Sequence, residues 1–491
     1  MLRTEFFFAL CLFGLVAVQG NPLDDYVMND DGHYSYTVLR DWTYKSPGHT
    51  SYLINMTSQQ WLTPNDTDRS LWWHFVIVHV PDEFDPALSN SAFLLIDGGG
   101  NDNPDNPPEI TDTFVMFTGL MAESSKSIVV DLKQIPNEHM TFKHDPKKQR
   151  RTEDAIIAYT WRHFLENPNQ PEWLLRMPMT KASVKAMDAV TDFINKTVGN
   201  QIERWCVGGA SKRGWTTWTT AAVDKRVQCM TPIVMDELNM VKNLHHHYRA
   251  YGGWSFAFKD YYDEDITKDL DHPNMPALAA IVDPLSYVDR LTMPKMVFST
   301  GGDEFFLPDD SHYYLTSMKG PMYVNMLPNA EHSCVGHELQ LMFNIKAFYV
   351  SVMKGKKLPQ ATWTLYNTAT GGGIDVTLDT VPTLIRAWSV TSISSKRRDF
   401  RLLRGNTTDV SAQPIVQPNI WHHSNVTSIG HLKYRAEFDT PLFGRWRAFF
   451  IQMTFPASDG NMIEFTTETN IIPDKFPYPD CYKDSCKGTL V

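Results

Sequence analysis

A serine that follows an apolar run and several small residues has the setting of a nucleophile. The run Trp205-Cys-Val-Gly-Gly-Ala leads into Ser211, and a helix-like segment follows. In a nucleophile elbow, small neighbours let the backbone turn sharply from strand to helix, which exposes the serine hydroxyl at the top of the sheet. The spacing departs from Gly-x-Ser-x-Gly, because Arg213 occupies the usual place of the second glycine, which comes at Gly214. The alternative is a serine that only caps the helix.

An acid and a histidine follow Ser211 in the chain order that this elbow requires. Asp303 stands directly after a strand-like run, and His332 lies in the loop after the next run. A serine hydroxyl is a weak nucleophile until an imidazole takes its proton, and a carboxylate must hold that imidazole in the correct tautomer. We therefore predict Ser211 as nucleophile, His332 as base and Asp303 as acid. Glu304 and Asp236 remain alternative acids.

A glycine run after an earlier strand is suited to stabilise a developing oxyanion. Leu95-Ile-Asp-Gly-Gly-Gly-Asn101 resembles the glycine-rich loops of esterases. We expect the backbone N–H groups of Gly99, Gly100 and Asn101 to supply one donor and the N–H of Lys212 to supply the other. The alternative is a flexible turn.

Neither a metal nor a cofactor is predicted. The run His245-His-His247 contains imidazoles, but consecutive residues of a helix point in different directions. No carboxylate stands at ligand spacing beside them. A place in a lid or on the surface explains these histidines better.

The elements that must position these residues alternate between apolar runs and helix-like segments. Most of the runs are continuously apolar, as is typical of strands buried on both faces of a sheet. They lie at residues 73–78, 93–96, 128–130, 205–207, 229–235, 295–299 and 322–326. Helices are expected at 152–165, 180–198 and 211–223. The alternation predicts an α/β fold with a doubly wound, mostly parallel sheet, as in α/β-hydrolases.

Two further regions depart from this alternation. An insertion rich in Tyr, Trp and His, at about 241–280, is placed to form a lid, because loops at the carboxyl ends of strands line the site. After residue 358, short β-rich runs separated by turns predict a smaller, β-sandwich-like domain. We expect a hydrolase domain over 21–355, the β domain over 360–480 and a tail over 481–491.

The N-terminal residues have the pattern of a secretory signal peptide over 1–20. The apolar run from Phe6 to Val18 is too short to span a bilayer, which needs about 20 residues. We expect a secreted protein without a membrane span. Sequons that agree with export begin at Asn55, Asn65, Asn195, Asn406 and Asn425.

Five cysteines follow the signal segment, so they cannot all pair within one chain. Cys481 and Cys486 are close enough to close a small loop. Cys206 and Cys229 can pair if their strands are neighbours, and Cys334 is then the odd thiol.

Composition excludes several classes of partner. The formal net charge is −11, from 45 basic and 56 acidic residues. Neither a nucleic acid nor an anionic membrane suits this balance.

The segment Gly209-Ala-Ser-Lys-Arg-Gly-Trp-Thr-Thr-Trp218 resembles the family of PhoPQ-activated pathogenicity-related proteins. Other stretches that carry the resemblance lie at 151–161, 232–236, 301–309, 386–388 and 398–401. The resemblance implies an α/β-hydrolase related to prolyl-oligopeptidase-type peptidases and to esterases. It also implies a second role, because a secreted eukaryotic member of the family acts as an extracellular signal that slows proliferation.

Two hypotheses about function follow. The first is a secreted serine hydrolase that cleaves an ester or peptide bond of a small substrate. The second is a secreted autocrine signal that represses proliferation through a cell-surface receptor, with the hydrolase site vestigial or secondary.

Overall fold

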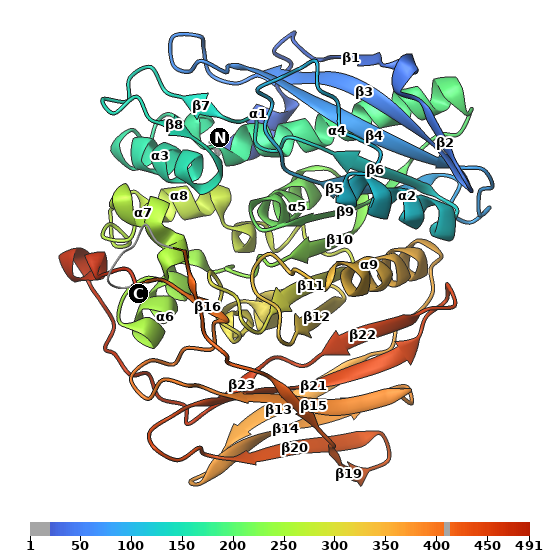
Figure 1. Cartoon of the computed structure of the whole chain (residues 1–491). Coiled ribbons are helices and arrows are strands. Elements are labelled where there is room, and N and C mark those ends of the chain that lie inside the picture. Colours follow the sequence, from blue (N-terminus) through green and yellow to red (C-terminus); the bar gives the residue numbers. More distant parts are fainter. Residues whose placement is uncertain (1–19, 407–412) are drawn as a thin grey trace, which may run out of the picture.

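The computed structural model describes residues 20–406 and 413–491. Its central sheet follows the strand order β1-β3-β4-β6-β5-β9-β10-β11-β12. These strands are β1 (Ser35–Val38), β3 (His49–Gln60), β4 (Leu71–Pro81), β6 (Ile128–Leu132), β5 (Ser91–Ile96), β9 (Arg204–Ala210), β10 (Val227–Ile233), β11 (Lys295–Thr300) and β12 (Met322–Leu327). The sheet crosses the upper two thirds of the molecule in Figure 1.

The strand directions identify the fold. Strand β4 is antiparallel to both of its neighbours, and the strands from β6 through β12 are parallel to one another. From β3 to β12, this order with one antiparallel second strand is that of the α/β-hydrolase fold. The fold predicted from the alternation of apolar runs is confirmed. Each predicted run lies in one of these strands, except that the run at 229–235 extends two residues past the end of β10.

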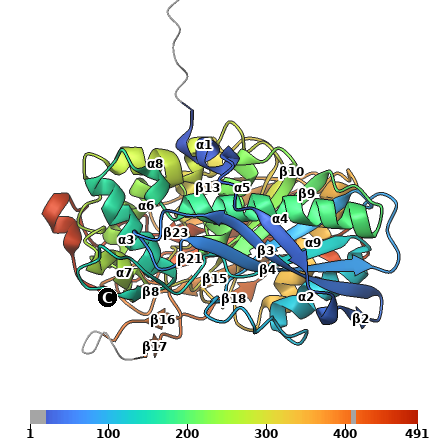
Figure 2. The ribbon, with the colours of Figure 1, turned by 90° about the horizontal axis from the view of Figure 1, so that it is seen from above.

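Helices cover both faces of the sheet. On one face α4 (Arg176–Thr197) and α5 (Lys212–Val223) pack against the strands, with α3 (Glu153–Glu166) at their side. On the other face lie α2 (Thr113–Ser125) and α9 (Glu338–Met353). Side chains of β5 therefore alternate between the two faces of the sheet. Leu94 and Ile96 belong to one apolar core, and Phe93 belongs to another. Seen from above, α4 runs along the sheet (Figure 2).

The insertion after β10 folds into helices beside the sheet edge. It contains α6 (Met240–Tyr251), η3 (Phe256–Phe258), α7 (Lys259–Asp263) and α8 (Met275–Val282). The C-terminal segment with η7 (Lys483–Lys487) lies against this insertion (Figure 1), where Trp254 exchanges backbone hydrogen bonds with Thr489 and Val491. The tail therefore stabilises the insertion, which the sequence did not indicate.

The C-terminal strands form two packed layers, which lie below the strands of the hydrolase domain in Figure 1. One group, β22 (Met462–Thr466), β21 (Arg447–Pro456), β15 (Leu384–Thr391) and β18 (His422–Ser424), continues the central sheet beyond β12, and β23 (Asn470–Ile472) pairs with β21. The other sheet consists of β13 (Ala361–Asn367), β14 (Gly371–Leu378), β20 (Lys433–Asp439) and β19 (Thr427–Gly430). Apolar side chains of both, such as Ile374 and Ile451, share one core. The β-sandwich-like region is confirmed, and the limits 21–355 and 360–480 stay a prediction.

The remaining elements are short. They are α1 (Pro22–Met28), η1 (Arg40–Trp42), β2 (Tyr44–Ser46), β7 (Met140–Thr141), β8 (Arg150–Arg151), η2 (Pro171–Trp173), η4 (Pro284–Tyr287), η5 (Asp310–Tyr313), η6 (Leu315–Ser317), β16 (Leu403–Arg404) and β17 (Ile415–Val416).

The predicted signal peptide falls almost wholly outside the described residues, of which Gly20 is the first. Within the described ranges, no helix combines the length and the apolar character needed to cross a membrane. Among the sequon asparagines, Asn65, Asn195 and Asn425 are exposed, and Asn55 and Asn406 are half-buried. Residues 407–408 of the Asn406 sequon lie outside the described part.

Two disulfides staple the chain. Cys206 in β9 and Cys229 in β10 are bonded, with their Cα atoms 4.6 Å apart. Cys481 and Cys486 close a short loop, with a Cα separation of 4.9 Å. Cys334 is free and buried.

Candidate active site

Ser211 occupies a sharp turn between β9 and α5. Its backbone has φ 56° and ψ −126°, a region that non-glycine residues rarely adopt. The packing beside this turn leaves no room for a side chain at position 209. A Cβ on Gly209 would lie 2.8 Å from the carbonyl oxygen of Arg213. A Cβ on Gly214 would lie 2.9 Å from the carbonyl oxygen of Ile233. The glycine one place later than usual thus still lets the helix approach the sheet.

The structure brings Ser211, His332 and Asp303 into one hydrogen-bonded chain. His332 Nε2 lies 2.8 Å from Ser211 Oγ. His332 Nδ1 lies 2.9 and 3.0 Å from the two carboxylate oxygens of Asp303. These distances are within hydrogen-bond reach, which is the geometry that a nucleophile, base and orienting acid need.

The turn after β11 holds Asp303 in place. Its carboxylate accepts hydrogen bonds from the backbone N–H groups of Phe305, at 2.7 Å, and Phe306, at 3.2 Å, and from the hydroxyl of Thr300 at 3.0 Å. Four hydrogen-bonded partners, including His332, thus fix both oxygens of a buried side chain.

The two alternative acids do not reach the imidazole ring. Glu304 accepts a hydrogen bond from the backbone N–H of His332 at 3.0 Å. Asp236 accepts one from the Ser299 hydroxyl at 2.9 Å. The structure therefore gives the contact with the ring to Asp303, and Glu304 instead fixes the loop that carries His332.

Burial and charge set the pKa values at this site. Burial alone would lower the pKa of His332, but the Asp303 carboxylate raises it above its ordinary value. Burial, with the neighbouring charge of Asp303, raises the pKa of Glu304 to about 7. The charge of Glu304 therefore changes near neutral pH.

Charged side chains next to the strand-to-helix turn form ion pairs with acidic residues of α3. Lys212 Nζ lies 2.6 Å from Glu153 and 3.1 Å from Asp154. Arg213 binds Glu153 and the carbonyl oxygen of Ile135. The roles of Glu153 and Arg213 were not predicted from the sequence. The signal was Arg213 itself, since a large cation in a usual glycine position must have acidic partners to be buried.

The predicted oxyanion donors are only partly available. The N–H of Lys212 opens α5, and the first N–H groups of a helix have no intrahelical partner. Asn101 is not available, because its N–H donates to the carbonyl oxygen of Glu138 at 2.8 Å. Gly99, at φ 112°, and Gly100 lie in the same loop, outside the lining of the cavities at Ser211, which instead includes Asp97 from this loop. Only Lys212 is thus placed beside the nucleophile as predicted.

Ser211 lies between two cavities. The larger has a volume of about 490 Å³ and is lined by Ser211, His332 and apolar side chains of α2 and α9, such as Phe117 and Leu341. The smaller measures about 30 Å³ and is lined by Ser211, aromatic rings and Glu237. The insertion predicted at 241–280 supplies one side of the smaller cavity. Both cavities therefore border Ser211.

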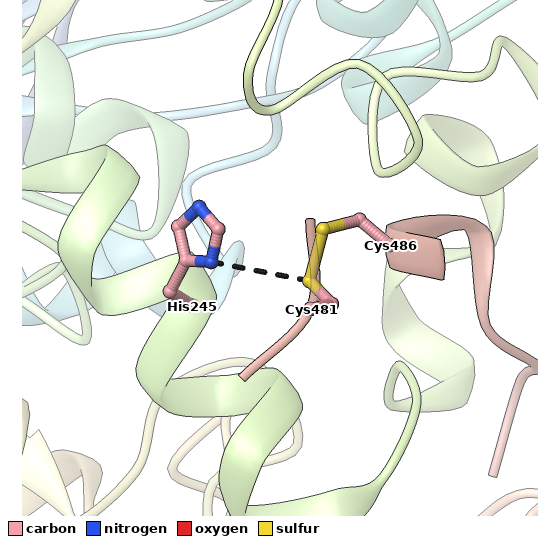
Figure 3. Close-up of side chains that lie close together, drawn as sticks. All are labelled: His245, Cys481 and Cys486. Atoms are coloured by element: carbon pink, nitrogen blue, oxygen red, sulfur yellow. Dashed lines mark hydrogen bonds between the residues drawn. A yellow bond between two sulfur atoms is a disulfide. The ribbon is translucent and has the colours of Figure 1, made fainter. Parts of the chain in front are cut away.

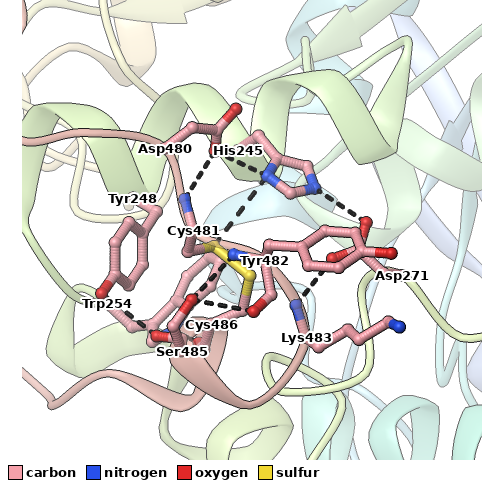
Figure 4. Close-up of a disulfide and its surroundings, with 10 residues drawn as sticks. All are labelled: His245, Tyr248, Trp254, Asp271, Asp480, Cys481, Tyr482, Lys483, Ser485 and Cys486. Atoms are coloured by element: carbon pink, nitrogen blue, oxygen red, sulfur yellow. Dashed lines mark hydrogen bonds and ion pairs between the residues drawn. A yellow bond between two sulfur atoms is a disulfide. The ribbon is translucent and has the colours of Figure 1, made fainter.

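The three consecutive histidines have separate partners. His245 points toward the disulfide sulfurs, with Nδ1 3.9 Å from Cys481 Sγ (Figure 3). Because those sulfurs are bonded to each other, they are not thiolate ligands for a metal. His245 instead lies 2.8 Å from Asp480 (Figure 4). His246 contacts Asp310 at 3.0 Å, and His247 accepts the N–H of Ser255 at 3.0 Å.

Comparison with known proteins places the chain in a family. A family model described as PhoPQ-activated pathogenicity-related protein matches residues 23–401. The chain belongs to this family. This match confirms the resemblance to the family that the sequence indicated. The matched range contains Ser211, Asp303 and His332. A relative from Dictyostelium discoideum, autocrine proliferation repressor protein A, is 37% identical over 498 residues, which cover 98% of this chain and 96% of the relative.

Solved structures similar to this member of the PhoPQ-related family include two esterases. Acetyl xylan esterase from Paenibacillus sp. R4 matches with a TM-score of 0.44 and 13% identity, over 66% of this chain and 91% of that chain. Acetyl xylan esterase 1 from Thermoanaerobacterium sp. JW/SL YS485 matches with a TM-score of 0.42 and 12% identity, over 68% of this chain and 95% of that chain.

Proposed function

We propose that the protein is a secreted serine hydrolase that cleaves an ester or peptide bond through an acyl-enzyme. The observation that carries the proposal is the hydrogen-bonded chain from Ser211 through His332 to Asp303, at the junction of two cavities. A merely structural serine would not need a strained backbone, a histidine at 2.8 Å and an acid behind it.

The proposed reaction has two halves. Ser211 Oγ attacks the substrate carbonyl carbon while its proton passes to His332 Nε2, and the N–H of Lys212 stabilises the oxyanion. The imidazolium then protonates the leaving group, which departs as an alcohol or amine. In the second half, His332 takes a proton from water, the hydroxide attacks the acyl carbon, and Ser211 regains its proton. Asp303 holds the imidazole in the required tautomer throughout.

Labelling with a fluorophosphonate tests this proposal. The wild-type protein should form a covalent adduct at Ser211, and Ser211→Ala should form none. Ser333→Ala is the matched control, because Ser333 lines the same cleft but donates its hydroxyl to Glu331. This control should label like the wild type. A folded wild-type protein that reacts no better than Ser211→Ala would refute the proposal.

A second role is favoured by the name of the 37% identical relative, autocrine proliferation repressor protein A. In this role the protein is a secreted signal read by a cell-surface receptor, and the hydrolase site is vestigial or secondary. Secreted wild-type and Ser211→Ala proteins, added at equal concentration to cells that express the protein, separate the two roles. Equal repression of proliferation supports the signal, and repression that needs Ser211 supports hydrolysis as its cause.

A further inference from the structure

Glu237 lines the smaller cavity beside the nucleophile. It follows β10 directly and shares the cavity lining with Ser211 and Lys212. Its side chain is nearly buried, since the residue exposes only 9% of its surface. Glu237 is therefore a mostly buried residue in the wall of a cavity that Ser211 also lines.

No hydrogen bond or ion pair joins the Glu237 carboxyl to any other described residue. Its neighbour in the lining, Asp154, differs in this respect. Asp154 forms an ion pair with Lys212 at 3.1 Å and accepts a hydrogen bond from the Tyr261 hydroxyl at 3.0 Å. Burying a carboxyl without a partner costs free energy, so such a group calls for a partner such as water, an ion or a ligand. A bound ligand can therefore supply the hydrogen-bond or ion-pair partner that the Glu237 carboxyl lacks.

The charges around Glu237 favour a positive ligand. Burial raises the pKa of Glu237 well above its ordinary value, and the carboxylates behind it raise it further. Those carboxylates belong to Asp310, Asp236, Asp283 and Asp303. A cation placed beside Glu237 would favour its ionised form, because it would offset both the burial and the repulsion from these neighbouring carboxyl groups.

The other walls of the cavity combine aromatic rings with one cation, Lys212, whose ammonium group is paired with Glu153 and Asp154. Aromatic rings from four elements line it, namely Trp161 of α3, Trp215 of α5, Phe258 of η3 and Tyr261 of α7. The faces of such rings attract ammonium and guanidinium groups, most strongly where water is excluded. The volume of about 30 Å³ is about twice that needed to hold one water molecule, which suits a compact ammonium group better than a broad guanidinium.

We infer that this cavity is a specificity pocket for a substrate that carries a primary ammonium group on a short apolar stem, with Glu237 as the counter-ion. The inference rests on the proposed hydrolase function and adds the class of substrate. The scissile carbonyl would sit at Ser211 and the ammonium group would enter between the aromatic rings. A lysyl ester or amide has this chemistry, and a norleucyl one lacks the ammonium group.

Hydrolysis of paired substrates tests the pocket. The two substrates are the p-nitrophenyl esters of Nα-acetyl-lysine and Nα-acetyl-norleucine, which differ in the side-chain ammonium group. Because the α-amine is acetylated in both, it carries no charge that could affect the comparison. The wild type should prefer the lysyl ester in kcat/KM, and Glu237→Gln should reduce that preference about ten- to hundredfold, as expected for loss of one contact to a charged group. Asp260→Asn is the matched control, because Asp260 lies in the same insertion but outside the cavity lining. It should keep the preference.

The outcomes separate this inference from the hydrolase proposal. Fluorophosphonate labelling of Ser211 reports the hydrolase alone. If labelling occurs and the lysyl preference is absent, or is equally reduced by Asp260→Asn, the pocket assignment is overturned while the hydrolase stands. If Glu237→Gln does not fold, inhibition of the wild type by pentylammonium decides. Stronger competition than by pentanol supports the pocket, and equal competition overturns it.

Discussion

At the scale of single residues, the chemistry depends on which side chains are charged at working pH. His332 accepts the Ser211 proton only when its imidazole is neutral, and its pKa is raised by Asp303 against the effect of burial. Glu304, with a pKa of about 7, contacts the same loop. The loop that carries His332 is therefore held by a group, Glu304, whose charge changes near neutral pH.

Ester hydrolysis should fall at acid pH as His332 becomes protonated. The apparent pKa of this limb in kcat/KM should exceed 6.5, the ordinary value for histidine. Glu304→Gln removes a negative charge that favours the imidazolium, so its acid limb should move to lower pH, by up to about one unit. A pH profile of both proteins measures this. An unchanged limb in the variant would mean that Glu304 has no electrostatic effect on the base.

Asp303→Asn should leave the fold intact and reduce kcat by several orders of magnitude, about 10⁴ by analogy with a serine-protease triad. An amide donates to His332 Nδ1 and so favours the wrong tautomer. Glu304→Gln is the comparison, since Glu304 does not contact the ring. Steady-state kinetics of both variants measure the difference, and equal losses would contradict the assignment of Asp303 as the orienting acid.

Glu237→Gln should increase stability at high pH. The raised pKa of Glu237 means that the folded protein binds its proton more tightly than the unfolded chain does. Above the unfolded pKa of about 4.3, the wild type therefore loses stability as pH rises, up to the folded pKa, and the variant does not. Urea unfolding at pH 5 and pH 8 should give the variant a gain that grows with pH, on the order of 1 kcal/mol or more. A gain that shrinks with pH would contradict this.

At the scale of elements, the elbow depends on close packing between the β5 loop, β9 and α5. A Cβ on Gly98 would collide with the guanidinium of Arg213, which pairs with Glu153 behind the nucleophile. Gly98 is thus required by a cation that replaces the usual glycine of the motif. This coupling joins two segments that are more than a hundred residues apart in the chain.

Gly98→Ala should destabilise the protein by about 1–3 kcal/mol, the usual cost of overpacking. In the double variant with Arg213→Ala the collision is absent, so the two effects should be non-additive by at least about 0.5 kcal/mol. Denaturant unfolding of the four proteins of this cycle gives the coupling. Additive effects would mean that the loop avoids Arg213 by moving.

At the scale of the whole molecule, one sheet runs from the hydrolase strands into the C-terminal region. Val324 in β12 pairs with Thr466 in β22, and the side chains of Asn325 and Asn344 bind the carbonyl oxygen of Glu464. The same core contains Phe348 from α9 and Phe465 from β22. The C-terminal strands therefore complete the hydrolase core and cover the edge of β12.

A chain truncated after Leu358 should not fold to a soluble monomer. Removing the C-terminal region exposes an unpaired strand edge and part of a shared apolar core, which are features that lead to aggregation. Expression followed by size-exclusion chromatography and circular dichroism measures the outcome. A soluble monomeric truncation that still labels at Ser211 would show that the hydrolase part is autonomous.

The sequence alone determined the fold class, the order of the strands along the chain and the positions of Ser211, Asp303 and His332. It could do so because buried parallel strands need continuous apolar runs and a strand-to-helix elbow needs small residues beside the serine. These are local requirements, and they leave local traces in the chain.

Only the tertiary structure decided which acid contacts His332, which N–H groups remain free and what lines the pocket. Asp303 and Glu304 are adjacent, so turn geometry alone separates their roles. Asn101 lost its expected role to the carbonyl oxygen of Glu138, and Glu237 gained a place beside Ser211 through the packing of the insertion. Contacts between distant segments depend on side-chain packing in three dimensions, and residue spacing carries no record of them.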